Sequence, residues 1–330
     1  MARTLPPLLT GDEKIAGPAS EALVLGPEYI GSLGPRFAVL GTKVRAIQAD
    51  EPPDRKLPPT GGIPRDRLFG VDFDNEPHGA IMGKSGAGKS NTTGVFVMNL
   101  VALQAQVYVA EPVESGDYSR FGDRISRATT PQGISDMLDF LCDEISRRRR
   151  LMATYVDPVS GRVGIAKYKD LPGNDGMLWG IFEEIAAIIG KASLFRSVNR
   201  GELVRRWFGQ LTEIAQRGRA ADVHGLFISQ LTTLTSWGGE DGNGIRSNAA
   251  FRLCHDRNPE NMKAAFDASA PATLKVIKAM ERRSPGRVAY TYCDRESNGE
   301  VRVGQVMYVS EEDAYRWVQK FEPRDLERFD

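Results

Sequence analysis

The sequence predicts an α/β protein in which a mainly parallel sheet is flanked by helices, preceded by a small Pro/Gly-rich β region. Two observations carry this prediction. Apolar strand-like runs alternate with helical segments from about residue 66 onward, and parallel strands need such crossover helices. Proline and glycine pairs are instead concentrated in the first 65 residues. We therefore expect an N-terminal β-rich arm and linker over residues 1–65 and a main domain over residues 66–330.

The N-terminal region is punctuated by pairs such as Gly26-Pro27, Gly34-Pro35 and Pro58-Pro59. Such pairs favour turns and short strands over long helices. Phe37–Ile47 is expected as a strand or a hairpin, and Asp50–Pro64 as a linker.

The main domain contains short apolar runs that are typical of strands buried on both faces. They are Ala80–Met82, Val107–Ala110, Leu178–Phe182, Gly225–Ser229 and Ala249–Leu253. Helices are expected over Asn91–Leu103, Ile134–Met152 and Gly201–Arg217. A closing hairpin is expected over Val288–Tyr292 and Val301–Val309, with Asn298-Gly299 as its turn.

The composition excludes several classes of protein. Of the 330 residues, 41% are hydrophobic, which is enough to bury a core and excludes a disordered chain. Lys+Arg and Asp+Glu are 43 each, so any binding of an anionic partner must come from local patches. The three cysteines stand far apart, which excludes a disulfide framework or a zinc site and indicates a reducing compartment.

The most apolar windows are interrupted by polar residues, as Val95–Ala110 is by Asn99, Gln104 and Gln106. A membrane span needs about 20 predominantly apolar residues, so we expect no transmembrane segment. The N-terminus lacks the apolar stretch of a signal peptide. We therefore expect a cytoplasmic protein, for which association with a membrane would need a membrane-protein recruiter.

The strongest motif lies between an expected strand and an expected helix and reads GxxxxGK[ST]. It consists of Gly83, Lys84, Ser85, Gly86, Ala87, Gly88, Lys89 and Ser90. Its glycines let several backbone N–H groups point at one phosphate chain, and the next helix adds its positive N-terminal end. Lys89 would reach the β- and γ-phosphates, and the Ser90 hydroxyl would bind Mg²⁺. The motif therefore predicts ATP and Mg²⁺ as cofactors; the alternative is a glycine-rich turn without a phosphate.

A second acidic motif follows the apolar run Leu178–Phe182. Glu183 is expected to hold Mg²⁺, in a position where Asp is usual, and Glu184 to polarise the attacking water. The alternative is that both are solvated acids at the end of a strand.

Several segments beyond these motifs resemble the FtsK/SpoIIIE family of DNA-pumping ATPases, over roughly residues 65–320. The matching segments, in order, are EISRRRRLMA (Glu144–Ala153), IAKY (Ile165–Tyr168), AQRGRAADVH (Ala215–His224), LFISQ (Leu226–Gln230), IRSNAAFRL (Ile245–Leu253), Pro285–Arg287 and QVMYVSEEDAY (Gln305–Tyr315). Each segment is weak alone, and their combination in this order is specific.

The resemblance implies a RecA-like P-loop NTPase that assembles as a homo-hexameric ring around double-stranded DNA and moves it by hydrolysing ATP. It also implies that Gln230 senses the γ-phosphate and that Arg252 enters the ATP site of the neighbouring subunit, where a guanidinium stabilises the transferring phosphoryl group. Rivals for that arginine role are Arg246, Arg217 and Arg219.

The sequence also departs from the family. The family's Q-R-P is Gln230-Leu231-Thr232 here, and its I-D-P-K is Ala110–Val113, without the lysine. The family's membrane-spanning region and its DNA-reading winged-helix domain have no counterpart in this sequence. These differences favour, by analogy, a transfer ATPase of a conjugative plasmid or integrative element, as in actinobacteria, over chromosome or plasmid partitioning.

Two basic clusters are candidates for contact with DNA phosphates. One is the run Arg147–Arg150, and the other is spread over residues 191–219. A solvated helix face or salt bridges between subunits is the alternative, and general experience with charge runs favours it for each cluster. His224 and His255, both at strand ends, are interpreted as structural.

Two other functions remain open. A ring ATPase of the type VII secretion kind would move protein substrates, and a nucleotide-dependent scaffold would bind DNA without pumping it. A GTPase is disfavoured because the sequence has no N-K-x-D motif. The pair Glu183-Glu184 followed by the strand-end Gln230 favours hydrolysis by water over a small-molecule kinase.

Overall fold

The structure is a computed structural model. It describes residues 36–43, 68–112, 116–185, 187–188, 200–230, 243–256, 258–266, 290–293, 301–307 and 309–329. The expected linker Asp50–Pro64, the turn Asn298-Gly299 and the family segment Pro285–Arg287 lie outside the described residues.

The described strands form one ten-stranded sheet in the order β2-β1-β10-β9-β8-β3-β7-β6-β4-β5. The strands are β1 (Phe37–Lys43), β2 (Leu68–Asp72), β3 (Gly79–Met82), β4 (Gln106–Ala110), β5 (Ser126–Ala128), β6 (Leu178–Phe182), β7 (Val223–Ser229), β8 (Phe251–Cys254), β9 (Tyr290–Cys293) and β10 (Val301–Val306). The six strands from β8 to β5 are parallel, and the remaining pairings are antiparallel. The predicted α/β fold with a mainly parallel sheet is therefore confirmed.

Strand β1 comes from the predicted N-terminal arm, yet it pairs with β2 and with β10. Its backbone is also tied to α1, because the Asn99 side chain accepts from the Val39 N–H at 2.9 Å and donates to the Val39 carbonyl at 3.0 Å. The boundary near residue 65 stays a prediction; β1 itself extends the main sheet.

The longest helices coincide with the expected ones and begin earlier. Among the described residues, the helices of eight or more residues are α1 (Lys89–Ala102), α2 (Pro131–Thr154), α4 (Arg200–Ala221), α6 (Pro259–Phe266) and α8 (Glu311–Val318). Helix α2 begins at Pro131 because the Thr130 hydroxyl accepts a hydrogen bond from the Gly133 N–H at 3.0 Å, and proline is favoured at the first helical position.

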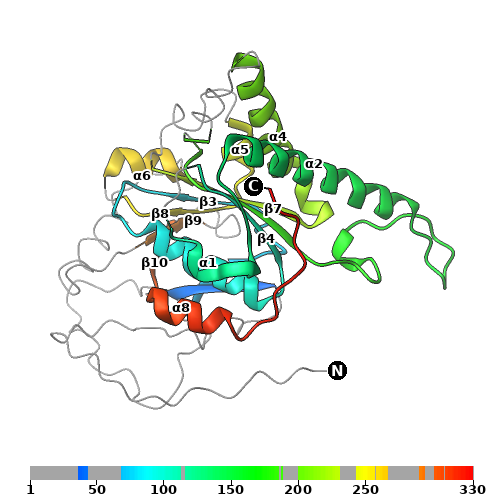
Figure 1. Cartoon of the computed structure of the whole chain (residues 1–330), viewed down its shortest axis with the longest axis horizontal. Coiled ribbons are helices and arrows are strands. Elements are labelled where there is room, and N and C mark those ends of the chain that lie inside the picture. The colour runs from blue at the N-terminus through cyan, green and yellow to red at the C-terminus, as the bar shows by residue number, and fades with distance from the viewer. Residues whose placement is uncertain are drawn as a thin grey trace.

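Helices cover both faces of the sheet (Figure 1). Along β6, Trp179 and Ile181 belong to the core that also contains α1 and α8 residues. The alternate residues Leu178 and Phe182 belong to the core with α2 and α4. This alternation is the two-residue period of a strand, and burial on both faces explains the continuous apolar runs.

The parallel strands bring the two predicted motifs to one edge of the sheet. Met82, the last residue of β3, pairs with Ser229 of β7, and Phe182 of β6 pairs with Phe227. Gly83, Glu183 and Gln230 therefore leave three neighbouring strands at their carboxyl ends, where ligands bind in open α/β sheets. In the described part of the chain, no helix combines the length and apolar character needed to cross a membrane.

Candidate nucleotide-binding site

The glycine-rich loop curls between β3 and α1. Gly83 has φ +148° and a side-chain carbon there would lie 2.7 Å from the His255 Cβ, so any larger residue would clash. Gly88 caps α1 with φ 99° and ψ 13°, a left-handed conformation that glycine adopts without strain. The Lys89 Nζ donates to the Gly83 carbonyl at 2.6 Å and to the Lys84 carbonyl at 3.3 Å. The lysine thus folds back over the loop.

The loop fits a triphosphate. Lys84, Ser85 and Gly86 are exposed, and nothing lies within 4 Å of the position that a Gly86 Cβ would take. Successive backbone N–H groups in such a turn form an anion-binding nest, reinforced by the N-terminus of α1. The chain can therefore hold phosphate at the place the sequence predicts.

His255 lies directly beneath this loop. Its Nδ1 is 3.1 Å from the Ala87 carbonyl oxygen and its Nε2 is 3.2 Å from the Thr92 hydroxyl. Because a carbonyl only accepts, Nδ1 carries the hydrogen and Nε2 accepts from Thr92. Burial lowers the pKa of His255 to about 3, so the ring is neutral. The sequence predicts a structural histidine; its specific place as a support of the P-loop depends on β8 lying next to β3.

Glu183 follows β6 and is held by Tyr118, whose phenolic hydroxyl donates to its Oε1. Burial, chiefly, raises the pKa of Glu183 to about 7; the charges of Asp117 and Glu184 add to this, while the Tyr118 hydrogen bond and Lys89 oppose it. Tyr118 was not recognised in the sequence, because nothing local marks it: it lies in the connection between β4 and β5.

Glu184 has an unusual backbone, with φ +50°. Non-glycine residues in this left-handed region are uncommon and occur often at functional sites. The Glu184 Oε1 accepts a hydrogen bond from the Gln230 backbone N–H at 3.3 Å, which joins the ends of β6 and β7. The charges of Glu184 and Glu183 both act to raise the pKa of Lys89 against the effect of burial. The lysine and the two acids follow β3 and β6, whose carboxyl ends lie at the same edge of the sheet.

The site also offers ligands suited to Mg²⁺. The exposed Ser90 lies in the first turn of α1, and Glu183 has one oxygen bonded to Tyr118 and a second oxygen besides. Mg²⁺ prefers hard oxygen ligands and is usually held by one or two carboxylates together with substrate phosphates and water. These residues fit that pattern.

Arg252 lies on β8 and bonds within its own chain. Its Nη1 donates to the Ala265 carbonyl at 3.0 Å and its Nη2 to the Arg246 carbonyl at 2.9 Å, so it connects α6 with α5 (Asn243–Asn248). A role in a neighbouring subunit stays a prediction and would require these bonds to break. Of its rivals, Arg217 pairs with Glu213 at 2.8 Å and Arg219 approaches the Asp74 carbonyl at 3.4 Å.

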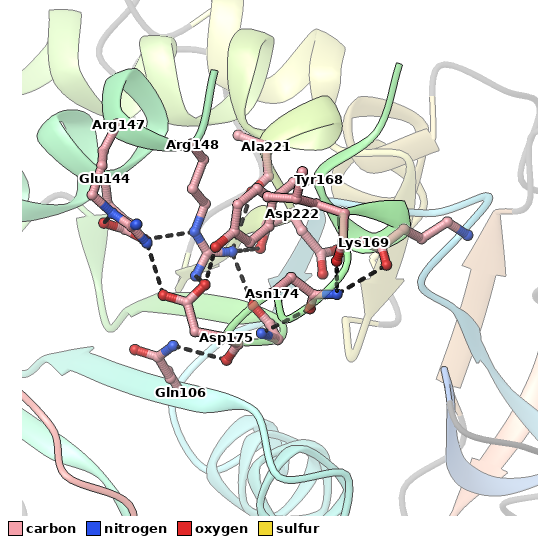
Figure 2. A network of polar contacts seen from close by, with 12 residues as sticks. Gln106, Glu144, Arg147, Arg148, Tyr168, Lys169, Asn174, Asp175, Ala221 and Asp222 are labelled. Atoms are coloured by element: carbon pink, nitrogen blue, oxygen red, sulfur yellow. Dashed lines mark hydrogen bonds and ion pairs between the residues drawn. The ribbon is translucent and has the colours of Figure 1, made fainter. Parts of the chain in front are cut away.

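Two of the four arginines in the predicted basic run, Arg147 and Arg148, form ion pairs within the chain (Figure 2). Arg148 is fully buried; its Nε donates to Glu144 at 2.6 Å, and its Nη1 donates to three carbonyl oxygens at 2.9–3.2 Å, those of Gly176, Ala221 and Asp222. Arg147 pairs with Glu144 and with Asp175. Only Arg149 and Arg150 are exposed, so the run is not a four-arginine surface. Buried Arg148 braces the amino ends of β6 and β7, at the edge opposite the P-loop.

Comparison with known proteins agrees with these observations. Residues 49–171 match the model of the FtsK/SpoIIIE family. The fold is similar to that of the pCW3 conjugation coupling protein TcpA, solved as a monomer with ATPγS (TM-score 0.63, 18% identity, 90% of this chain and 73% of that chain). It is also similar to the cytoplasmic domain of the type VII secretion ATPase EccC from Thermomonospora curvata (TM-score 0.56, 15% identity, 86% and 31%).

A third similar structure is EssC, ATPases 2 and 3, from Geobacillus thermodenitrificans (TM-score 0.55, 13% identity, 98% of this chain and 54% of that chain). No curated protein matches the sequence. The family match thus confirms the resemblance to the FtsK/SpoIIIE family over residues 49–171, and the solved structures confirm the fold.

Proposed function

Starting from an FtsK/SpoIIIE-type ATPase, we propose that the chain is an ATP-driven double-stranded DNA translocase that works as a homo-hexameric ring in conjugative transfer. The observation that supports the catalytic part is that the loop ending in Lys89 and the acids Glu183 and Glu184 follow β3 and β6 at the same edge of the sheet. This constellation offers a phosphate-binding cation, a metal-binding acid and a candidate base at one edge of the sheet.

The residues take the following roles in ATP hydrolysis. The backbone N–H groups of residues 83–90 and the Lys89 ammonium bind the phosphates, and this requires Lys89 to leave the Gly83 carbonyl. Ser90 and Glu183 would hold Mg²⁺, which would neutralise charge on the phosphates. Glu184 orients and polarises the attacking water, and Gln230, whose backbone already bonds to Glu184, senses the γ-phosphate.

The DNA part of the proposal is supported less directly. The fold is similar to that of a conjugation coupling protein, and exposed arginines of the predicted cluster over residues 191–219, such as Arg217 and Arg219 on α4, can contact phosphates. The similar structures include TcpA, a conjugation coupling protein, and EccC, a secretion ATPase. We therefore include a membrane-protein recruiter among the proposed partners.

The fold similarity to EccC and EssC favours one alternative, a ring ATPase that moves protein substrates. A nucleotide-dependent DNA-binding scaffold is the remaining alternative. The three functions differ in what accelerates ATP turnover: DNA for the translocase, a protein substrate for the secretion ATPase, and neither for the scaffold.

The test is the rate of ATP hydrolysis with and without long double-stranded DNA, at low and high salt. We expect strong stimulation that declines with salt, because phosphate contacts release counterions. Glu184→Gln should bind ATP and lose turnover, Lys89→Ala should lose both, and the exposed Glu322→Gln serves as the matched carboxylate control. Basal turnover that DNA leaves unchanged would contradict the translocase. Acceleration by a protein substrate would then distinguish the protein-moving ATPase from the scaffold.

A further inference from the structure

The last turn of α2 and the hairpin after it form a projection. We define the α2 tip as residues 149–167, and Figure 1 shows it standing out beyond the sheet at the end of α2. Val156 and Val163 form an antiparallel bridge. The Asp157 N–H donates to the Arg162 carbonyl at 2.9 Å, and the Gly164 N–H donates to the Tyr155 carbonyl at 2.8 Å. The α2 tip is therefore a closed hairpin with a defined shape.

The turn of this hairpin is also held by a side chain. The Asp157 Oδ1 accepts from the backbone N–H of Val159 at 2.9 Å and of Ser160 at 2.7 Å. A side chain that caps its own turn in this way stabilises it locally. Because the shape exists before any binding event, little conformational entropy is lost when a partner binds.

The surface of the α2 tip is apolar and cationic. Of the five large hydrophobic residues that are exposed in the described part of the chain, four lie on it: Leu151 (38% exposed), Val156 (55%), Val159 (94%) and Val163 (67%). It also carries four exposed cations, which make no ion pair within the described residues: Arg149, Arg150, Arg162 and Lys167. Clustered exposed apolar groups mark interaction sites, and arginine is enriched at protein interfaces.

The complementary surface lies on α8. Its first turn carries Glu311, Glu312 and Asp313, of which Glu312 also pairs with Arg316 on the same helix. Tyr315, 53% exposed, is the fifth large hydrophobic residue on the surface of the described chain. The α8 residues Ala314 and Val318 pack in the core on one face of the sheet, whereas α2 packs in the core on the other face. Figure 1 shows α8 and α2 on opposite sides of the sheet.

We propose that the α2 tip of one copy docks on the α8 surface of the next copy. The apolar groups of the tip would pack on Tyr315 while its arginines meet the acidic first turn, a pairing of opposite charges that also orients the two chains. Since the two surfaces differ and lie on opposite faces, the contact is head-to-tail, which closes into a ring or continues as a filament. The inference rests on the ring assembly proposed above and names the surfaces that build it.

Helix α8 is also connected in the fold to Glu183, the proposed metal-binding acid. The Arg124 Nε donates to the Val318 carbonyl at 2.8 Å and to the Phe321 carbonyl at 3.1 Å, which joins α8 to the segment η3 (Ser119–Arg124). That segment begins directly after Tyr118, the residue that holds Glu183. A contact on α8 is therefore one short segment away from the site.

The test is a charge exchange measured by sedimentation velocity on the full chain with ATP. Arg149→Glu with Arg150→Glu should weaken self-association at least tenfold, and so should Glu311→Arg with Glu312→Arg. The protein with all four substitutions should recover most of the association. Arg205→Glu, an exposed cation on α4, is the matched control and should leave association unchanged; thermal melts establish that each variant is folded.

A second measurement checks the contact itself. Val159→Cys in one preparation mixed with Tyr315→Cys in another should give a disulfide-linked heterodimer under oxidation. Unchanged association in both exchanged pairs, no recovery with all four substitutions, or a wild-type chain that stays monomeric with ATP and DNA would each overturn the inference. So would variants that assemble normally but lose stimulation by DNA, which would assign the tip to DNA. DNA-stimulated hydrolysis in the wild type separately decides the proposed function.

Discussion

The phenolic hydroxyl of Tyr118 donates a hydrogen bond to Glu183, the first acid after β6. Tyr118 is only 3% exposed, and its own pKa is raised well above the usual value by burial and by the charge of Glu183, so it remains a donor. Burial raises the pKa of Glu183 to about 7, and this hydrogen bond opposes that shift. Tyr118 therefore both orients the proposed metal-binding acid and favours its ionised form.

Replacing Tyr118 by phenylalanine should slow hydrolysis more than it weakens ATP binding. A hydrogen bond to a charged group contributes about 1.5–3 kcal/mol, so we expect kcat to fall roughly 10- to 100-fold. The KM for ATP should change little, because the P-loop is untouched. Steady-state ATPase assays and nucleotide titrations measure the two effects.

The control for this substitution is Tyr108→Phe, because Tyr108 is equally buried but its hydroxyl donates to Gln106 at 3.4 Å, away from the P-loop. Both variants should melt near the wild type. If kcat is unaltered in Tyr118→Phe, or falls equally in Tyr108→Phe, Tyr118 does not position Glu183 for hydrolysis.

His255→Gln should alter the pH dependence of stability. The native ring stays neutral down to about pH 3, whereas the unfolded chain takes up a proton below about pH 6.5. The wild type therefore loses stability as pH falls from 6.5 toward 3, by up to about 1.4 kcal/mol per pH unit from this group. Urea unfolding at pH 7, 6 and 5 should show a flatter dependence in the variant; equal slopes would contradict the assignment.

Asp222→Asn should destabilise the fold without touching the nucleotide site. Asp222 pairs with Arg36 at 2.5 Å and with His224 at 2.9 Å, and these bonds lower its pKa against the opposing effect of burial. Breaking a buried pair costs about 3–5 kcal/mol. Asparagine tolerates the positive φ of 56° at this position. The loss of stability therefore comes from the removed charge and not from backbone strain.

The sign of the pH effect at Asp222 follows from its lowered pKa. Its stabilisation is complete above the unfolded value of about 4 and is lost as pH falls below it. The difference in unfolding free energy between wild type and Asp222→Asn should therefore be constant from pH 7 to about 5 and shrink in stronger acid. A difference that grows on acidification would show that Asp222 is not held ionised.

Arg252→Ala distinguishes a role in the ATP site of a neighbouring subunit from a structural role within its own chain. If the resemblance holds at this residue, turnover in the assembled ring should fall on the order of a thousandfold. Mixing with Lys89→Ala should then restore part of it, because mixed rings contain some sites with both residues intact. If mixing restores no turnover and the variant melts at a lower temperature, the role of Arg252 is structural, through its bonds to α5 and α6.

Local patterns in the sequence were enough to predict much of the fold. The apolar runs that became β3, β4, β6, β7 and β8 were recognisable because strands buried on both faces need continuous apolar residues. The P-loop was recognisable because its glycines and Lys89 are consecutive. The alternation of strands and helices then placed Glu183 and Gln230 at the same edge as that loop.

Contacts between distant residues were decided only by the tertiary structure. Tyr118 lies 65 positions from Glu183 and His255 lies 168 from Ala87, and both contacts depend on strand order, which no local period encodes. Arg148 looked like one of four surface arginines. It is buried because Glu144 lies one turn earlier on α2 and because carbonyls of other segments converge on it. The sequence by itself determined the inner strands, the three long helices and the place of the glycine-rich loop. The tertiary structure decided which side chains support that loop, because burial and hydrogen bonding depend on neighbours brought together only by folding.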